Sequence, residues 1–254
     1  MKPYAIIVGV FFIFALASLG IHATSAHAAG IRVLSSNGVH SVTAAMVPEF
    51  ERATGHKVSI DYYTANQALG LIKKGEFADL VILTRPAIDG LIKEGKIAKG
   101  GGKDLARSGV GVAIRAGLPK PDISTGDKLK RALLDAKSIT FTKTGGSGIH
   151  VVKVTERLGI AKEVNAKAIT PEGGAVGPIV ARGEADMAVQ QIPELLAVKT
   201  IQYVGPLPEG FQHFTLFTAG VLTGARQPGA AKALIDFLTS PAAAQLYKAK
   251  GFEP

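Results

Sequence analysis

The sequence predicts an α/β protein made of two similar units, and three observations point to this class. Short β-rich runs alternate with amphipathic stretches near the start of the chain, and the same alternation returns after residue 138. Two further apolar runs lie where the chain has to pass between the units. Because strands that alternate with helices form parallel sheets covered by helices, we expect two α/β domains.

The first unit alternates strands and helices throughout. Glycine residues end its predicted helices, and its last strand is apolar enough to be covered on both faces. In order, the predicted elements are a strand over 31–36, a break at Asn37-Gly38, a helix over 42–54 ended by Gly55, a strand over 57–63, a helix over 68–74 ended by Gly75, and a strand over 78–83.

The second unit repeats this pattern around a glycine-rich turn. A strand over 138–141 leads into the turn 144–148, and a helix over 149–158 follows, closed by Gly159. The turn contains Gly146-Ser147-Gly148, but the glycine spacing does not match a hydrolase nucleophile elbow, and the lysine of a phosphate-binding P-loop is missing. The sequence therefore gives no support to a serine hydrolase or a nucleotide-binding protein.

Two apolar runs, 109–114 and 214–222, are expected to cross between the units. Two such connections between the units would form a hinge about which the units can move. The amphipathic region 229–250 is interrupted at Ser240-Pro241, where proline in a first turn would start a new helix. We expect this region to pack back on the first unit. The predicted domains are 30–112 together with 218–254, and 113–217.

The first 29 residues have the pattern of a cleavable export signal, since Lys2 precedes an apolar run over 6–19 and small residues follow it. The run is shorter than the roughly 20 apolar residues that a bilayer span needs, which favours a cleaved signal over an uncleaved membrane anchor. Ala26 and Ala28 supply the small residues that signal peptidase requires. We expect cleavage after Ala28 or Ala29, and a mature protein in the periplasm.

Composition restricts the classes of partner. The formal net charge is +9, and removal of Lys2 with the signal leaves +8. Excess positive charge favours an anionic ligand, although a solvated basic exterior is the simpler alternative. The basic residues are scattered and aromatic residues make up only 6% of the chain, which excludes nucleic acid as a partner. There is no cysteine and the histidines have no metal spacing, so we expect no metal and no other cofactor, and we expect a monomer.

Three turns at predicted helix entries carry small polar residues, namely 35–38, 64–66 and 145–148. Free backbone N–H groups and the helix dipole make such positions anion sites without any charged side chain. Each turn taken singly is equally well an ordinary helix cap. Their convergence on one cleft is the prediction, and the ligand contacts it gives are Ser36, Asn37, Gly38, Asn66 and Ser147.

Two cations lie beside the predicted turns. Thr84-Arg85-Pro86 follows the third strand, and Lys143 precedes the glycine turn. The fork of Arg85 would pair with a carboxylate through two parallel hydrogen bonds, which points to an organic carboxylate as ligand. We therefore add Thr84 and Arg85 to the predicted contacts, with a solvent-facing Arg85 as the alternative.

Three motifs, in this order, resemble the molybdate-binding family of periplasmic solute-binding proteins: the region 31–50 with the helix end ATG at 53–55, the strand ADLVI at 78–82, and the passage VARGEAD at 180–186. The similarity spans essentially the whole mature chain. It implies a two-domain type II periplasmic-binding-protein fold with a hinged interdomain cleft. It also implies an ABC permease of the inner membrane as partner.

The ligand positions of that family transfer unevenly. The serine of its first turn falls near Gly38, the second falls near Ala65-Asn66, and Gln190 replaces the tyrosine that follows the GEAD strand. Ser147 and Gly173 match positions where the family uses backbone N–H groups. The resemblance thus implies that the backbone half of the anion site is kept and that the side-chain half is altered, with Gln190 and Gly173 as further contacts.

We expect a periplasmic receptor that closes on a small anion, a molybdate-like oxyanion or an organic carboxylate, for an ABC importer. The chain also resembles aconitate isomerases, enzymes of the same superfamily. Such a reaction moves a double bond by removing and returning a proton, so it needs a base and cationic clamps. Here the base would be His40 or His150, and the clamps would be Arg85 and Lys143. A cell-surface adhesion module fits the export signal but not the hinged layout.

Overall fold

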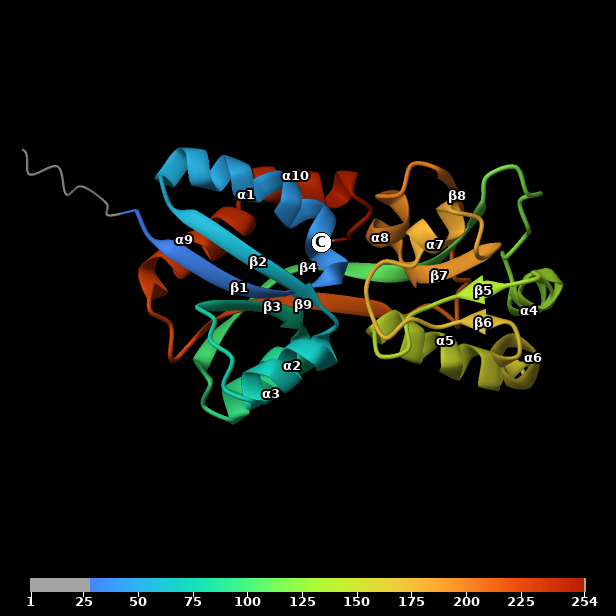
Figure 1. The fold of residues 1–254 in the computed structure, drawn as a ribbon, viewed down its shortest axis with the longest axis horizontal. Coiled ribbons are helices and arrows are strands. Elements are labelled where there is room, and N and C mark those ends of the chain that lie inside the picture. Colours follow the sequence, from blue (N-terminus) through green and yellow to red (C-terminus); the bar gives the residue numbers. More distant parts are fainter. Residues whose placement is uncertain (1–27, 254) are drawn as a thin grey trace, which may run out of the picture.

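The computed structural model describes residues 28–253, which form two lobes joined by two long strands (Figure 1). The predicted export signal, residues 1–29, lies outside the described residues except for Ala28 and Ala29. The described strands form one mixed sheet of nine, and helices cover it, as expected for the α/β class. None of the helices within residues 28–253 has both the length and the apolar character that a bilayer crossing requires.

The first lobe begins with three strand-to-helix units. They are β1 (Gly30–Ser36), η1 (Asn37–Val39), α1 (His40–Thr54), β2 (Lys57–Tyr63), α2 (Ala65–Lys73), β3 (Leu80–Thr84) and α3 (Arg85–Lys93). β1 pairs in parallel with both β2 and β3. Successive side chains of a strand point to opposite faces, so Val33 lies in the core under α1 and Leu34 in the core under α2 and α3.

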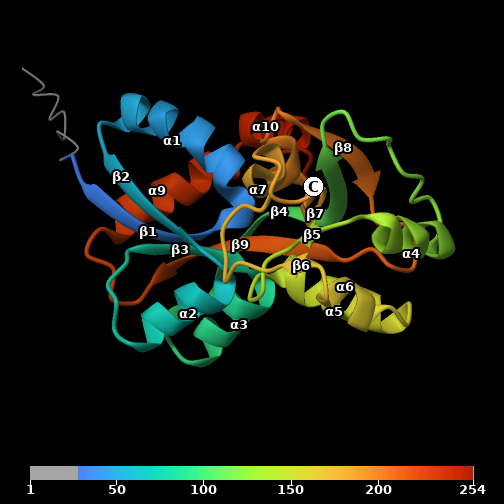
Figure 2. The same ribbon diagram turned by 45° about the vertical axis from the view of Figure 1, so that its right-hand side comes forward.

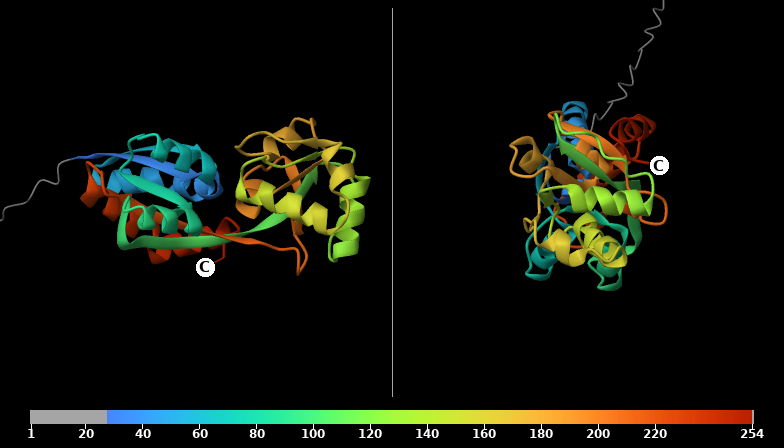
Figure 3. Two further views of the ribbon diagram at one scale, coloured as in Figure 1. Left: turned by 90° about the horizontal axis from the view of Figure 1, so that it is seen from below. Right: turned by 90° about the vertical axis from the view of Figure 1, so that its right-hand side faces the viewer.

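Two strands cross between the lobes, β4 (Ile97–Arg115) and β9 (Phe214–Leu222), and Figure 3 shows them side by side where the lobes meet. β9 has the predicted bounds. β4 begins well before the predicted run 109–114, because the glycine run 100–102 continues the strand with a shifted register instead of ending it. The part of β4 up to Gly109 pairs with β9, and the part from Val110 onward pairs with strands of the second lobe.

The second lobe contains the remaining strands and five helices. They are α4 (Gly126–Asp135), β5 (Ile139–Thr140), α5 (Gly146–Arg157), α6 (Ala161–Asn165), β6 (Ala168–Ile169), α7 (Gly177–Ala181), β7 (Met187–Gln191), α8 (Ile192–Leu196) and β8 (Ile201–Pro206). The predicted strand and helix on either side of the glycine turn are confirmed as β5 and α5. Their side chains Ile139, Val151 and Val154 belong to the main core of this lobe.

The chain returns to the first lobe in α9 (Pro228–Leu238) and α10 (Pro241–Ala249), as predicted. Both lie with α1 on one side of the first-lobe sheet, and α2 and α3 lie on the other side (Figure 2). Ser240 caps α10 by accepting from the N–H of Ala243 at 3.2 Å. The buried carboxylate of Asp79 fixes the entry to α9, because its Oδ1 accepts from the N–H groups of Arg226 and Gln227 at 2.7 and 2.9 Å.

Candidate functional site

Three helix entries of the first lobe meet at one cavity. Because β1, β2 and β3 are parallel, their carboxyl ends lie at the same edge of the sheet, where α/β proteins bind ligands. Each strand leads directly into a helix, and the N-cap residues Ser36, Thr64 and Thr84 all line the cavity. Helix N-termini carry a partial positive charge, so all three elements favour negative charge in the same space.

The second lobe closes the cavity with the N-terminus of α5. Its N-cap is Gly145, which has no side chain to bond the first N–H groups of the helix. An uncapped helix N-terminus offers backbone donors to an anion. The lining residues are Ser36, Asn37, Gly38, Tyr63, Thr64, Ala65, Thr84, Thr142, Gly145, Gly146, Ser147, Gly174, Gln190, Gln191, Glu194, Thr215 and Phe217.

The cavity is small and wrapped by both lobes. Its volume is about 40 Å³. A cavity of this volume holds about three water molecules. The site in this form therefore suits a small ion.

The glycine turn packs tightly on Thr142, and this packing requires glycine at positions 145 and 148. A Cβ on Gly148 would lie 1.6 Å from the carbonyl oxygen of Thr142, and a Cβ on Gly145 would lie 2.3 Å from the Thr142 hydroxyl. That hydroxyl is buried and has no hydrogen-bond partner within residues 28–253. Buried polar groups are nearly always hydrogen-bonded, so the Thr142 Oγ1 is a donor available to a ligand.

Gly38 also has a packing reason to be glycine. Its Cβ would lie 2.3 Å from Cζ of Phe217, whose buried ring forms part of the cavity wall. Phe217 belongs to β9, so one of the two crossing strands reaches the cavity directly. A change in the crossing of the strands would therefore alter the cavity wall.

The cavity lining carries one carboxyl group, that of Glu194 on α8. Its Oε1 accepts a hydrogen bond from Nε2 of Gln190 at 3.0 Å. Gln190 is itself held by backbone groups, since it donates to the carbonyl of Gly174 at 2.8 Å and accepts from the N–H of Val176 at 2.9 Å. Burial raises the pKa of Glu194 to about 8, so the side chain is mainly uncharged at pH 7.

The lobes touch directly at the mouth of the cavity. The Thr64 and Thr144 hydroxyl oxygens are 3.3 Å apart, and Nδ2 of Asn66 donates to the Thr144 carbonyl at 3.3 Å. A Cβ on Gly173 would lie 2.9 Å from both the Thr64 methyl group and the Gln67 amide oxygen. These contacts hold the two lobes in a closed arrangement.

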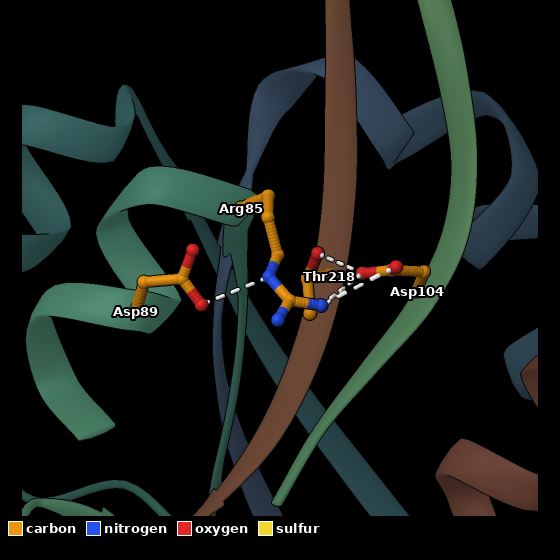
Figure 4. Close-up of polar contacts among 4 residues, drawn as sticks. All are labelled: Arg85, Asp89, Asp104 and Thr218. Atoms are coloured by element: carbon orange, nitrogen blue, oxygen red, sulfur yellow. Dashed lines mark hydrogen bonds and ion pairs between the residues drawn. The ribbon is translucent and has the colours of Figure 1, made fainter. Parts of the chain in front are cut away.

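Arg85 is not among the residues that line the cavity. Its Nε donates to Asp89 at 2.9 Å and its Nη1 donates to Asp104 at 3.1 Å, so two carboxylates already neutralise the guanidinium (Figure 4). Asp104 also accepts from the buried Thr218 hydroxyl at 2.6 Å. Arg85 thus ties α3 to β4, and Asp104 in turn ties β4 to β9. The argument from Arg85 to an organic carboxylate loses its structural support.

The other predicted charged groups also lie outside the cavity lining. Lys143 pairs with Glu172 at 2.9 Å, and both side chains are exposed. The His40 ring packs edge-on against Tyr62. The Nε2 of His150 lies 2.7 Å from the carbonyl oxygen of Phe211. Neither histidine is positioned as a base for a ligand in this cavity.

The structure brings six of the nine predicted contact residues into one cavity lining: Ser36, Asn37, Gly38, Thr84, Ser147 and Gln190. Asn66 and Gly173 lie at the contact between the lobes instead, and Arg85 lies outside. A role in ligand binding stays a prediction for all nine.

Sequence reasoning missed Thr142 and Glu194. Thr142 lies two residues before the predicted turn 144–148, so the need to bury a residue under a glycine-rich turn was a usable signal. Glu194 stands in the run Ile192–Leu196, where a glutamate reads as an ordinary first-turn residue of a helix. No pattern in the sequence marks its side chain as facing a cavity.

Comparison with known proteins places this site in context. A family model described as a bacterial extracellular solute-binding protein matches residues 31–253. An aconitate isomerase of Pseudomonas sp is 34% identical over 233 residues, which cover 88% of this chain and 87% of that protein. A molybdate-binding protein of Azotobacter vinelandii is 26% identical over 244 residues, which cover 92% and 93%.

The solved structure of the periplasmic molybdate-binding protein of Azotobacter vinelandii has a TM-score of 0.74 with this chain. The match covers 88% of this chain and 99% of that one, at 17% sequence identity. A likeness at this identity concerns the fold and not the ligand. The predicted fold class, two α/β domains with a cleft between them, is confirmed.

Proposed function

Because the chain belongs to the bacterial extracellular solute-binding protein family, we propose that it captures a small anion between its lobes and presents it to an ABC importer. The observation that carries this proposal is the convergence of Ser36, Thr64 and Thr84 with the uncapped N-terminus of α5 on one closed cavity. The proposal includes export to the periplasm, cleavage after Ala28 or Ala29, a monomeric receptor and a permease of the inner membrane as partner.

Neutral donors favour an oxyanion. No lysine or arginine is among the described residues that line the cavity, so hydroxyl and backbone N–H groups would hold the ligand. Hydrogen bonds from such donors to an ionised acceptor are strong where water is excluded. A tetrahedral oxyanion with four acceptor oxygens fits a small cavity surrounded by such donors, and the molybdate-binding relative supports this choice.

The two lobes would open and close around the crossing strands. We propose the division already expected from the sequence, with 30–112 and 218–254 moving against 113–217. The contacts of Asn66 and Gly173 across the mouth of the cavity support a closed state that traps the ligand. Opening would break these contacts and expose the N-cap residues to solvent.

Calorimetric titration with molybdate, tungstate, sulfate, citrate and the two aconitates tests this proposal. Removal of the free hydroxyl by Thr142→Val should weaken oxyanion binding about tenfold, since a hydrogen bond to a charged group is lost. Ser41→Ala is the matched control, because the Ser41 hydroxyl also lacks a partner within residues 28–253 but lies outside the cavity lining. The receptor proposal would be refuted if none of these anions binds.

A second candidate is an isomerase that acts on aconitate between the same two lobes, which would have to open further to admit a molecule larger than the closed cavity. The 34% identity to an aconitate isomerase favours it. The position of Glu194 also favours it, because this titratable side chain lines the cavity, whereas His40 and His150 lie outside the lining. The ionised form of Glu194, a minor fraction at pH 7, would take a proton from a methylene carbon and return it at the other end of the shifting double bond. Proton NMR of the purified protein with each aconitate isomer tests for interconversion. Oxyanion binding without interconversion would eliminate this candidate.

A further inference from the structure

Glu194 is a cavity carboxyl group that anion capture by neutral donors leaves unexplained. An ionised carboxylate next to a bound anion would repel it, and the other lining residues supply no cation to offset that repulsion. Within residues 28–253, the side chain takes part in no ion pair and in one hydrogen bond, which it accepts from Gln190 at 3.0 Å. Its presence in the lining therefore needs a reason compatible with a negatively charged ligand.

The hydrogen bond from Gln190 occupies one carboxyl oxygen of Glu194 and leaves the other free. Its amide oxygen accepts from the Val176 N–H and its amide nitrogen donates to the Gly174 carbonyl, so the orientation of the amide is fixed by two backbone groups. The amide nitrogen also donates to Oε1 of Glu194. Oε2 has no hydrogen bond within residues 28–253, which leaves it to carry a proton and to donate that proton to a ligand.

The surroundings of Glu194 supply no charge that would ionise it. α8 packs against β4, β7, β8, η1 and α1. The titratable and charged side chains of these elements are Lys99, Lys103, Asp104, Arg107 and Arg115 on β4, Tyr203 on β8, and His40, Glu49, Glu51 and Arg52 on α1, with none on β7 or η1. Burial raises the pKa of Glu194, and within residues 28–253 no ion pair or hydrogen bond joins any of these groups to it. Tyr63 is the other titratable residue in the lining.

We propose that Glu194 enters the bound complex as an uncharged carboxylic acid and donates a hydrogen bond from Oε2 to the anion, so that its proton controls the binding of fully deprotonated anions. This inference rests on the proposed function. Such anions include molybdate and sulfate, which offer only acceptors. Loss of the Glu194 proton replaces a donor by a negative charge and so blocks their binding. Hydrogen phosphate carries its own proton and can donate it to the ionised carboxylate, so it escapes this block.

Calorimetric titration with sulfate and molybdate from pH 6.5 to 9.5 tests the inference. The affinity of the natural sequence should be nearly constant below about pH 7.5 and should fall about fivefold from pH 8 to pH 9, because only the protonated fraction binds. At pH 9, binding should take up nearly one proton per anion, measured in two buffers of different ionisation enthalpy. Phosphate binding should not fall in parallel.

Two variants decide the outcome. Glu194→Gln keeps a donor that cannot ionise, so it should bind sulfate within a few-fold of the natural sequence at pH 7 and show no decrease at pH 9. Tyr63→Phe is the matched control, since it removes the other titratable group of the lining and should keep the pH dependence. If Glu194→Gln does not fold, the proton uptake of the natural sequence decides by itself.

A pH-independent affinity of the natural sequence up to pH 9.5 would overturn the inference and leave the receptor proposal standing. A pH dependence that survives in Glu194→Gln would do the same. Failure of the natural sequence to bind any of the three anions at pH 7 would instead overturn the proposed function, and this inference with it.

Discussion

The two lobes build their halves of the cavity by different means. The first lobe supplies hydroxyl-bearing N-cap residues, Ser36, Thr64 and Thr84, at the ends of three parallel strands. The second lobe supplies the backbone of a glycine turn, which can close on Thr142 because Gly145 and Gly148 lack side chains. The first half therefore depends on functional groups that sheet register puts in place, and the second half depends in addition on a backbone shape that leaves no room for a Cβ at Gly145 or Gly148.

This difference predicts its largest effect at Gly148. Gly148→Ala would place a methyl group 1.6 Å from the Thr142 carbonyl oxygen, and backbone on both sides must move to relieve the clash. We expect the free energy of unfolding to fall by about 3 kcal/mol, as for a severe overpacking substitution. Urea denaturation measures it.

Gly146→Ala is the matched control within the same turn, because nothing lies within 4 Å of its Cβ position. It should leave the free energy of unfolding nearly unchanged and, as a better helix former than glycine, alanine should slightly favour α5. Equal losses in the two variants would contradict the view that close packing on Thr142 is what requires glycine at position 148.

The second-lobe half also predicts a pH effect on stability through Glu194. The folded protein holds the proton of Glu194 up to a pKa of about 8, whereas the ordinary value is 4.5. Between these values the unfolded chain releases the proton and the folded protein does not. The stabilisation is therefore complete below pH 4.5 and is lost as the pH rises to about 8.

Relative to Glu194→Gln, the natural sequence should lose about 3 kcal/mol of unfolding free energy between pH 5 and pH 8. This value allows for partial access of solvent to Glu194 through the cavity. Urea denaturation at four pH values measures the difference. Glu172→Gln, at an exposed glutamate paired with Lys143, should show no such trend. Parallel pH profiles of the natural sequence and Glu194→Gln would contradict the raised pKa.

The same difference between the halves explains what the sequence can predict. β1, β2 and their caps follow from alternating apolar residues and from Ser, Thr and Asn at helix entries, which are local signals. The predicted contact Ser36 follows from such a signal and lies in the lining, whereas Thr84 was added with Arg85 because both follow the third strand. The bounds of the crossing strand β9 also agree with the predicted run 214–222, because apolar residues make up most of that run.

The remaining parts of the site depend on contacts between distant segments. Arg85 lies beside the cavity-lining Thr84, but Asp104, 19 residues away, engages its guanidinium. Glu194 enters the lining because the short helix α8 packs between the strands of the second lobe and η1. Sequence spacing does not encode such long-range pairing. For this reason the architecture was predicted more completely than the chemistry.

The contact between the two lobes at the mouth of the cavity can be weakened by a substitution that leaves the fold of each lobe intact. In Gly173→Ala the new methyl group would lie 2.9 Å from Thr64 and Gln67, so the lobes have to separate slightly to accept it. We expect about tenfold weaker anion binding, because the closed state becomes less populated, and an unfolding free energy within about 0.5 kcal/mol of the natural value. Titration calorimetry and urea denaturation measure the two quantities.

Gly70→Ala on α2 is the control for Gly173→Ala, since its Cβ position has no neighbour within 4 Å. It should bind anions like the natural sequence. If Gly173→Ala binds equally well, the contact at the mouth of the cavity has no part in closure.

The smallest effect is expected at Arg85, the residue that on sequence grounds was the strongest argument for an organic carboxylate. Its guanidinium is bound to Asp89 and Asp104 and does not line the cavity. Exposed ion pairs contribute little to stability. Arg85→Ala should therefore change the affinity for sulfate, molybdate and citrate by less than about twofold, whereas Thr84→Ala at the adjacent lining position should weaken binding several-fold, as expected for loss of one hydrogen bond. A loss for citrate that is absent for sulfate would show that Arg85 leaves Asp104 to reach larger ligands, and the first-lobe half would then contribute a charge that the closed form conceals.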